Sequence, residues 1–146
     1  MLTFFAKAFS QESLSLIGKW KTLEVSAENF IVNRNDSIIL PEEMKNYSKV
    51  SLQNRRAHIR TYYSKNIFVF EDNDFYLYKN ENPRTIIFDG KFKITSENKI
   101  IFNVKNIARQ DVETTAIYHF ENGELHLKMY AENNSVINYV LTKVED

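Results

Sequence analysis

Apolar and polar residues alternate along most of the chain beyond residue 66, and this period of two is typical of β-strands that bury one face. The alternating stretches are short, and most are separated by only a few polar residues. Such connections suit antiparallel neighbours but not parallel crossovers, so the pattern predicts an antiparallel meander. With one strand near the N-terminus, the predicted strands are 16–26, 67–71, 75–79, 85–95, 99–105, 114–121, 124–131 and 135–144.

The dipeptide Asn122-Gly123 gives the strongest turn signal, because both residues readily adopt the positive φ angles of a type I′ hairpin. Pairing outward from this turn sets Phe120 opposite Leu125 and Tyr118 opposite Leu127. The register that the turn predicts therefore agrees with the register that buries apolar side chains on one face.

Three further hairpins can be tested in the same way. A turn at Asp72-Asn73, a three-residue loop at 96–98 and another at 132–134 each align apolar residues on one face. In the loop at 96–98 we expect Asn98 to take the left-handed conformation. The predicted inward pairs are Phe70–Phe75, Phe68–Leu77, Ile94–Ile100, Phe92–Phe102, Met129–Ile137, Leu127–Tyr139 and Leu125–Leu141.

One helical segment interrupts the strands. The run Pro41-Glu42-Glu43 predicts a helix start, because proline suits the first helical position and acidic residues suit the positive end of the helix dipole. The helix is expected over about 41–63, with a break near 49–51. Its apolar residues are sparse, which predicts loose packing, and residues 26–40 before it follow no regular pattern.

Eight antiparallel strands with one apolar face close most economically into a barrel, since closure leaves no exposed sheet edge. Gly90 lies in the middle of a long strand and would permit the bend that a small barrel requires. The predicted fold is mainly all-β, an eight-stranded antiparallel up-and-down β-barrel with a helical insert after the first strand. The length of 146 residues suits one such domain, over 14–146.

Composition narrows the functional classes. Nineteen basic and nineteen acidic residues cancel, so the chain lacks the excess positive charge of a nucleic-acid binder, and no nucleic-acid partner is predicted. The chain has no cysteine, which excludes disulfides and thiolate chemistry. No stretch approaches the roughly 20 apolar residues of a transmembrane segment. Eleven phenylalanines and eight tyrosines favour strands around a bulky interior.

The first residues differ from the rest of the chain. Leu2, Phe4 and Phe5 make the N-terminus apolar, and Ala8-Phe9-Ser10 has the small-x-small form of signal-peptide cleavage sites. The apolar stretch is short, however, and no basic residue precedes it. We interpret residues 1–13 either as the remnant of an export signal, which predicts a periplasmic or secreted protein, or as a flexible N-terminus, which predicts a cytoplasmic one.

The motif Gly18-Lys19-Trp20 stands at the first predicted strand. A Gly-x-Trp motif there, in a meander whose last strand ends with a basic residue, resembles the lipocalin-like domains of the calycin superfamily. The resemblance implies that Trp20 plugs the closed end of the barrel and that Lys143 packs across its ring, a contact worth about 0.5–2 kcal/mol. The family more often has arginine at that position and lacks so long an insert. Because the chain has no cysteine, a bacterial lipocalin-like protein fits better than an animal carrier.

The fatty-acid-binding branch of the same superfamily also inserts helices after its first strand. Its carboxylate-binding Arg-x-Tyr motif is absent, since Asn138-Tyr139-Val140 stands at that place. The resemblance implies a small hydrophobic, lipid-like ligand inside the barrel. The inward-facing residues predicted to bind it are Phe68, Phe88, Phe92, Phe102, Tyr118, Leu127 and Tyr139.

A second interpretation belongs to another functional class. In it the barrel is filled by its own aromatic side chains, and its loops or helical insert bind a protein partner in the cell envelope. An apolar cavity of roughly 300 Å³ or more, open at one end, would favour the carrier over this interaction module.

Between Met44 and Phe70 the chain carries basic residues and no acidic one. In a neutral protein this is a local positive patch, and it could guide an anionic head group or a membrane surface toward the barrel mouth. Arg55, Arg56 and Arg60 are the candidate head-group ligands. The alternative is a solvated helix face on which Arg60 complements the negative helix end.

His119 and His126 lie opposite one another in the register of the Asn122-Gly123 hairpin, close enough to share one ion. Their parity points them outward, and the pattern defines no carboxylate position beside them. We therefore interpret them as exposed polar residues and predict no metal site and no cofactor.

Catalytic signatures are missing from the sequence. There is no Gly-x-Ser-x-Gly motif and no phosphate-binding glycine loop, and neighbouring acids lie at helix starts and turns, where structure already explains them. We expect a protein that is not an enzyme.

Overall fold

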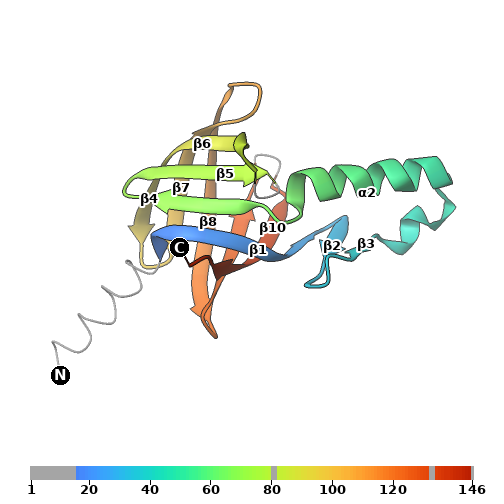
Figure 1. The fold of residues 1–146 in the computed structure, drawn as a ribbon, viewed down its shortest axis with the longest axis horizontal. Helices are drawn as coiled ribbons and strands as arrows, with labels where there is room; N and C mark the ends of the chain where they lie inside the picture. The colour runs from blue at the N-terminus through green and yellow to red at the C-terminus, as the bar shows by residue number, and fades with distance from the viewer. Residues whose placement is uncertain (1–15, 80–81, 132–133, 146) are drawn as a thin grey trace.

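The computed structural model describes residues 16–79, 82–131 and 134–145, so the predicted export-signal remnant at 1–13 lies outside the described residues. Eight strands pair antiparallel with their neighbours, and pairing between the last and the first closes them into a barrel (Figure 1). The predicted eight-stranded barrel is confirmed. Its strands are β1 (Gly18–Ala27), β4 (Ile67–Glu71), β5 (Asp74–Lys79), β6 (Asn82–Ser96), β7 (Lys99–Lys105), β8 (Asp111–Glu121), β9 (Glu124–Tyr130) and β10 (Val136–Lys143).

The predicted registers are confirmed in every hairpin that was tested. At the β8–β9 turn, Asn122 and Gly123 take φ angles of 53° and 76°, as a type I′ turn requires. Phe120 then pairs with Leu125. The predicted pairs of the β4–β5, β6–β7 and β9–β10 hairpins are present in the same way.

The prediction for Asn98 is wrong, because this residue is not among the described residues with a positive φ angle. Ser96 pairs directly with Lys99, and the register shifts between Ile94 and Ser96. An irregularity within β6 therefore supplies the extra residue that we had assigned to the loop.

The insert after β1 is more structured than predicted. Two short strands, β2 (Phe30–Val32) and β3 (Ile38–Ile39), extend the sheet from the end of β1. A 3₁₀ helix, η1 (Glu42–Asn46), and the helix α2 (Lys49–Tyr63) follow, so the break lies at 47–48, slightly before the predicted 49–51. Ser48 caps the N-terminus of α2, since its side chain accepts a hydrogen bond of 3.1 Å from the Ser51 amide.

Helix α2 projects away from the barrel and meets it near its C-terminal end (Figure 1). Within α2 only Ile59 is buried, which confirms the predicted loose packing. The rings of Tyr63 and Phe30 lie 4.8 Å apart, and Arg56 donates a hydrogen bond of 2.7 Å to the Ile38 carbonyl. These contacts fix one part of the helix, while Val50 near its start remains 65% exposed. In the described residues no helix combines the length and apolar character needed to cross a membrane.

Phenylalanine rings fill part of the barrel interior. Phe70 lies 5.1 Å from both Phe75 and Phe92, and Phe75 lies 4.7 Å from Phe102, between ring centroids. These four side chains are almost fully buried, and tilted or edge-to-face contacts of this kind stabilise a core beyond simple burial of area.

Gly90 lies where two strands come unusually close. A Cβ atom at this position would stand 2.3 Å from the Asn103 carbonyl oxygen and 2.6 Å from the Val104 Cα atom. Both atoms belong to the backbone of β7 and cannot rotate away. Glycine is therefore required at this point of β6 for β7 to pair at its observed distance.

Candidate functional site at the barrel mouth

An open cavity of about 500 Å³ lies at the end of the barrel that α2 approaches, which we call the mouth. Its lining is largely apolar and comes from three sources. The barrel contributes Leu77, Ile87, Phe88 and Tyr139, helix α2 contributes His58, Tyr62 and Tyr63, and the β7–β8 loop contributes Asn106, Ile107 and Ala108. The volume is above the roughly 300 Å³ expected of a carrier, but the cavity lies at the mouth, and the interior below it is filled by aromatic side chains, as the interaction-module interpretation predicts.

Two successive residues of β6 line this cavity, which a regular strand does not allow. Phe88 pairs with Leu77, whereas Ile86 pairs with Tyr78, so the register shifts by one residue between them. Ile87 lies in this irregularity and is buried, although strict alternation from Phe88 would turn it outward. The irregularity thus adds an apolar side chain to the site.

Tyr139 provides a polar group at the cavity. The side chain is only 6% exposed, and its ring packs edge-on against Phe68 with centroids 4.9 Å apart. Burial, assisted by the neighbouring Tyr63, raises the pKa of the Tyr139 phenol well above its usual range. The hydroxyl is therefore an uncharged polar group at neutral pH.

Helix α2 supplies an aromatic rim. The rings of His58 and Tyr62 lie 4.8 Å apart, as their spacing of four residues on a helix permits. The Lys79 ammonium at the end of β5 lies 5.4 Å from the Tyr62 ring centroid, within the range of a cation–π contact. The rim therefore combines aromatic surface with one nearby positive charge.

Of the residues predicted to bind a ligand, Phe88 and Tyr139 line the mouth cavity. The other five do not line it and are buried in the core. They are Phe68, Phe92, Phe102, Tyr118 and Leu127. The sequence did not predict the lining residues on α2 and on the β7–β8 loop. Alternation with a period of two predicts the direction of a side chain only within a strand. Among these lining residues, only Tyr63 could have been suspected, because it is the last apolar residue of the predicted helix.

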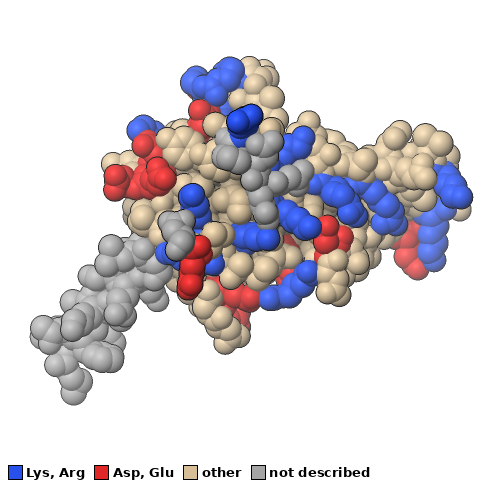
Figure 2. All heavy atoms as spheres, viewed as in Figure 1, with Lys and Arg blue, Asp and Glu red and all other residues tan. Residues whose placement is uncertain are grey.

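The three candidate head-group arginines lie on α2, and none of them lines the cavity. Arg56 bonds to the Ile38 carbonyl, and Arg60 Nη1 lies 3.7 Å from the Asp36 carboxylate. Arg55 is partly buried, and its Nε atom has no hydrogen-bond partner among the described residues. On the face shown in Figure 2, lysine and arginine side chains gather along α2.

The opposite end of the barrel is closed by the contact that the lipocalin resemblance implies. Trp20 is 2% exposed, and its indole Nε1 donates a hydrogen bond of 2.9 Å to the Leu16 carbonyl. Lys143 pairs with Trp20 across the β1–β10 seam. Its Nζ atom lies 5.1 Å from the Trp20 ring and donates a hydrogen bond of 2.7 Å to the Ile17 carbonyl.

Gly18 leaves room for this lysine. A Cβ atom on Gly18 would lie 2.9 Å from Lys143 Cε, and the φ angle of 131° is one that other residues rarely adopt. The Gly-x-Trp motif and Lys143 thus form one packed unit at the closed end, far along the strands from the mouth.

A second open groove, of about 580 Å³, borders β6, β7 and β8. Two ion pairs lie within it: Lys105 bonds to Asp111 at 2.7 Å, and Arg109 bonds to Asp89 at 2.9 Å. The hydrogen bond from Lys105 lowers the pKa of the Asp111 carboxyl. The groove is lined mainly by charged and polar side chains, whereas the mouth cavity is lined mainly by apolar ones, so we assign the mouth cavity as the candidate site for a hydrophobic ligand.

The fold and the cavity define the protein as a closed eight-stranded antiparallel β-barrel with an apolar mouth. No family model matches the chain, and no curated protein matches it. Among solved structures, a redesigned beta barrel aligns with a TM-score of 0.51 over 90% of this chain and 94% of that chain. The two sequences are 10% identical, so the similarity concerns the fold alone.

Proposed function

We propose that the protein is a lipocalin-like carrier, without enzymatic activity, that binds a small hydrophobic ligand in the mouth cavity. The observation that carries the proposal is the apolar cavity of about 500 Å³, bounded by Leu77, Ile87 and Phe88. A lipid-like molecule with one polar end suits it best, because the apolar walls would hold a chain and the Tyr139 hydroxyl would meet a single polar group. Export to the periplasm or the medium belongs to the same proposal.

Native mass spectrometry of protein purified from its own host tests whether a lipid is bound, and titration with fatty acids and a hydrophobic fluorescent dye measures the affinity. We expect Ile87→Phe, which adds bulk inside the cavity, to weaken dye binding at least about tenfold, or roughly 1.4 kcal/mol. The matched control is Ile117→Phe on β8, at a side chain that is 40% exposed. Absence of a bound lipid together with absence of fatty-acid and dye binding would refute the carrier, as would equal affinities of the two variants.

A second candidate function rests on helix α2. Its projection from the barrel and its basic side chains suit contact with a protein partner in the cell envelope (Figures 1 and 2). Tyr47 and Val50 are 54% and 65% exposed, which adds apolar surface beside these charges. A photo-crosslinking residue at Val50, compared with one at Ile117, tests this function in living cells. A defined envelope protein captured at Val50 alone would favour the interaction module.

A further inference from the structure

Two histidines and a glutamate converge on the outer face of the β8–β9 hairpin. His119 and His126 are register partners, and their rings stack 4.7 Å apart with an angle of 17° between the ring planes. Glu121 Oε2 lies 3.6 Å from His119 Nε2 and 3.7 Å from His126 Nε2. One ligand atom from each of the three residues lies within 4.8 Å of the other two.

These separations match those of ligands that share one ion. Nitrogen and oxygen ligands bind zinc at about 2.0–2.2 Å, so two ligands of a tetrahedral ion stand about 3.3–3.6 Å apart. Both distances from Glu121 to the histidines are already close to this value. Closing the remaining distance requires small rotations of the side chains, and the His119 and Glu121 side chains are 62% and 61% exposed and free to make them.

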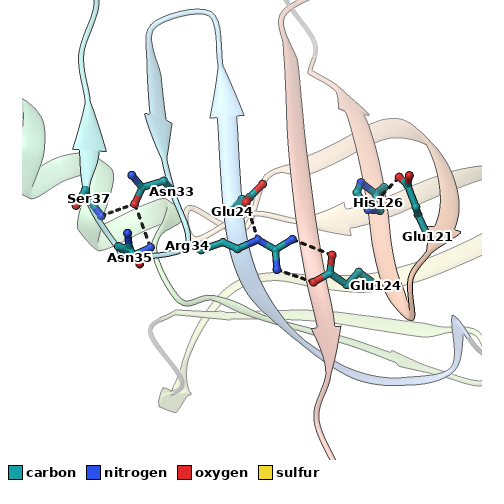
Figure 3. Close-up of polar contacts among 8 residues, drawn as sticks. All are labelled: Glu24, Asn33, Arg34, Asn35, Ser37, Glu121, Glu124 and His126. Atoms are coloured by element: carbon teal, nitrogen blue, oxygen red, sulfur yellow. Dashed lines mark hydrogen bonds and ion pairs between the residues drawn. The ribbon is translucent and has the colours of Figure 1, made fainter.

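The nearby Arg34 binds Glu124, so the carboxylate of Glu121 is available to the two histidines. Glu124, its partner across the hairpin, is bound by both terminal nitrogens of Arg34 at 2.7 and 2.8 Å (Figure 3). Among the described residues, the Glu121 carboxylate forms ion pairs only with the two histidines. The Asn122-Gly123 turn between the strands holds the backbone of the three residues in a fixed register.

We propose that His119, Glu121 and His126 form a binding site for a divalent transition-metal ion, with Zn²⁺ as the ion that fits best. Imidazole nitrogens select zinc, copper and nickel over magnesium and calcium, and one carboxylate completes a common three-ligand set. The exposed position leaves the fourth ligand to water. The site lies on the outer surface toward the closed end, so it is separate from the mouth cavity and independent of the proposed carrier function.

Calorimetric titration of the untagged full chain with ZnCl₂ tests the site, and MgCl₂ serves as the comparison ion. We expect one Zn²⁺ ion per chain and no detectable Mg²⁺ binding. His126→Ala and Glu121→Gln should each weaken zinc binding by about 100-fold or more, since loss of a group that only orients a ligand already costs 10- to 100-fold. His58→Ala, which changes the remaining histidine, is the matched control and should bind zinc like the wild type.

Imidazole nitrogen NMR gives a second readout that does not depend on the variants. Zinc should shift the Nε2 resonances of His119 and His126 together and leave those of His58 in place. The proposal is overturned if the wild type binds no zinc, if the His126 and Glu121 variants bind it as tightly as the wild type, or if the His58 variant loses binding equally. Ile87→Phe should keep full zinc affinity, which separates this site from the mouth cavity.

Discussion

Gly90 is the residue at which a single methyl group should have the largest effect on the barrel. A Cβ atom there would overlap backbone atoms of Asn103 and Val104, so β7 would have to move away from β6. We expect Gly90→Ala to lower the free energy of unfolding by about 3 kcal/mol, at the upper end of the cost of overpacking. Urea unfolding measures this change.

Gly123→Ala is the control for this prediction. No atom lies within 4 Å of a Cβ at Gly123, so the substitution costs only the strain of its φ angle of 76°, about 1–2 kcal/mol. Equal losses in the two variants would mean that the close approach of β7 does not constrain position 90.

Lys143 should stabilise the closed end through Trp20. Lys143→Met keeps most of the aliphatic stem but removes the charge above the ring and the hydrogen bond to the Ile17 carbonyl. We expect a loss of about 1–2 kcal/mol, the sum of an exposed cation–π contact and one hydrogen bond. Trp20 is the only tryptophan of the chain, so its fluorescence reports unfolding and the change at the ring in one experiment.

Lys93→Met is the matched control, because Lys93 is an exposed lysine on β6. Its substitution should change the unfolding free energy by less than about 0.5 kcal/mol and leave the emission of Trp20 unchanged. If the two lysine variants behave alike, Lys143 does not support the closed end.

The limits of sequence reasoning at the residue scale are visible at Ile87. Alternation along a strand predicts Phe88 and Phe92 as inward residues correctly, because regular pleating alone decides their direction. It assigns Ile87 to the outside, and only the irregular pairing with β5 turns this side chain inward. Nothing in the composition of the strand marks such an irregularity, since it depends on how two strands meet in space.

At the scale of whole elements, the hairpins could be predicted and the insert could not. Asn122-Gly123 and Asp72-Asn73 fix their hairpins locally, and each register is checked independently by the apolar face. The strands β2 and β3 have three and two residues, too few for a periodic pattern, and they form because β1 extends far enough to pair with β2. The projection of α2, and with it the aromatic rim of the cavity, depends on such long-range contacts.

Arg34 links elements that the chain order separates. It follows β2, bonds to Glu24 on β1 at 2.7 Å, and reaches Glu124 at the start of β9 (Figure 3). Hydrogen bonding from Arg34 lowers the pKa of Glu124 below its ordinary value of 4.5. The folded state therefore binds a proton at Glu124 less readily than the unfolded state, and the resulting stabilisation is present above about pH 4.5 and lost as the pH falls further.

We expect Glu124→Gln to be less stable than the wild type at pH 7, by an amount that shrinks as the pH falls below 4.5. Thermal unfolding of both proteins across this range measures the difference, and contributions from other carboxylates cancel because both proteins share them. Glu113→Gln, at an exposed glutamate of β8, should show no such pH-dependent difference. A Glu124 effect of constant size from neutral to acid pH would contradict the prediction.

For the molecule as a whole, pairing between β1 and β10 decides whether the sheet is a closed barrel. The chain has no native cysteine, so an engineered disulfide can test this pairing. Lys21 and Thr142 are register partners across this seam. Directly opposed Cα atoms in antiparallel strands lie about 4.5–5.5 Å apart, within the span of a disulfide. We expect Lys21→Cys with Thr142→Cys to form this bond on oxidation and to raise the unfolding free energy by about 2–4 kcal/mol, since it joins distant parts of the chain.

The pair Lys21→Cys with Asn138→Cys is the control for the seam, because Asn138 pairs with Ser26 and lies several residues further along β10. Mass spectrometry under oxidising and reducing conditions shows whether each bond forms, and unfolding under both conditions shows its effect on stability. A closed barrel predicts the bond and the gain only for the Thr142 pair. If that pair stays reduced, or if both pairs crosslink equally, β1 and β10 do not hold the observed register. That register closes the barrel, places Lys143 opposite Trp20 at one end, and brings Tyr139 to the mouth at the other.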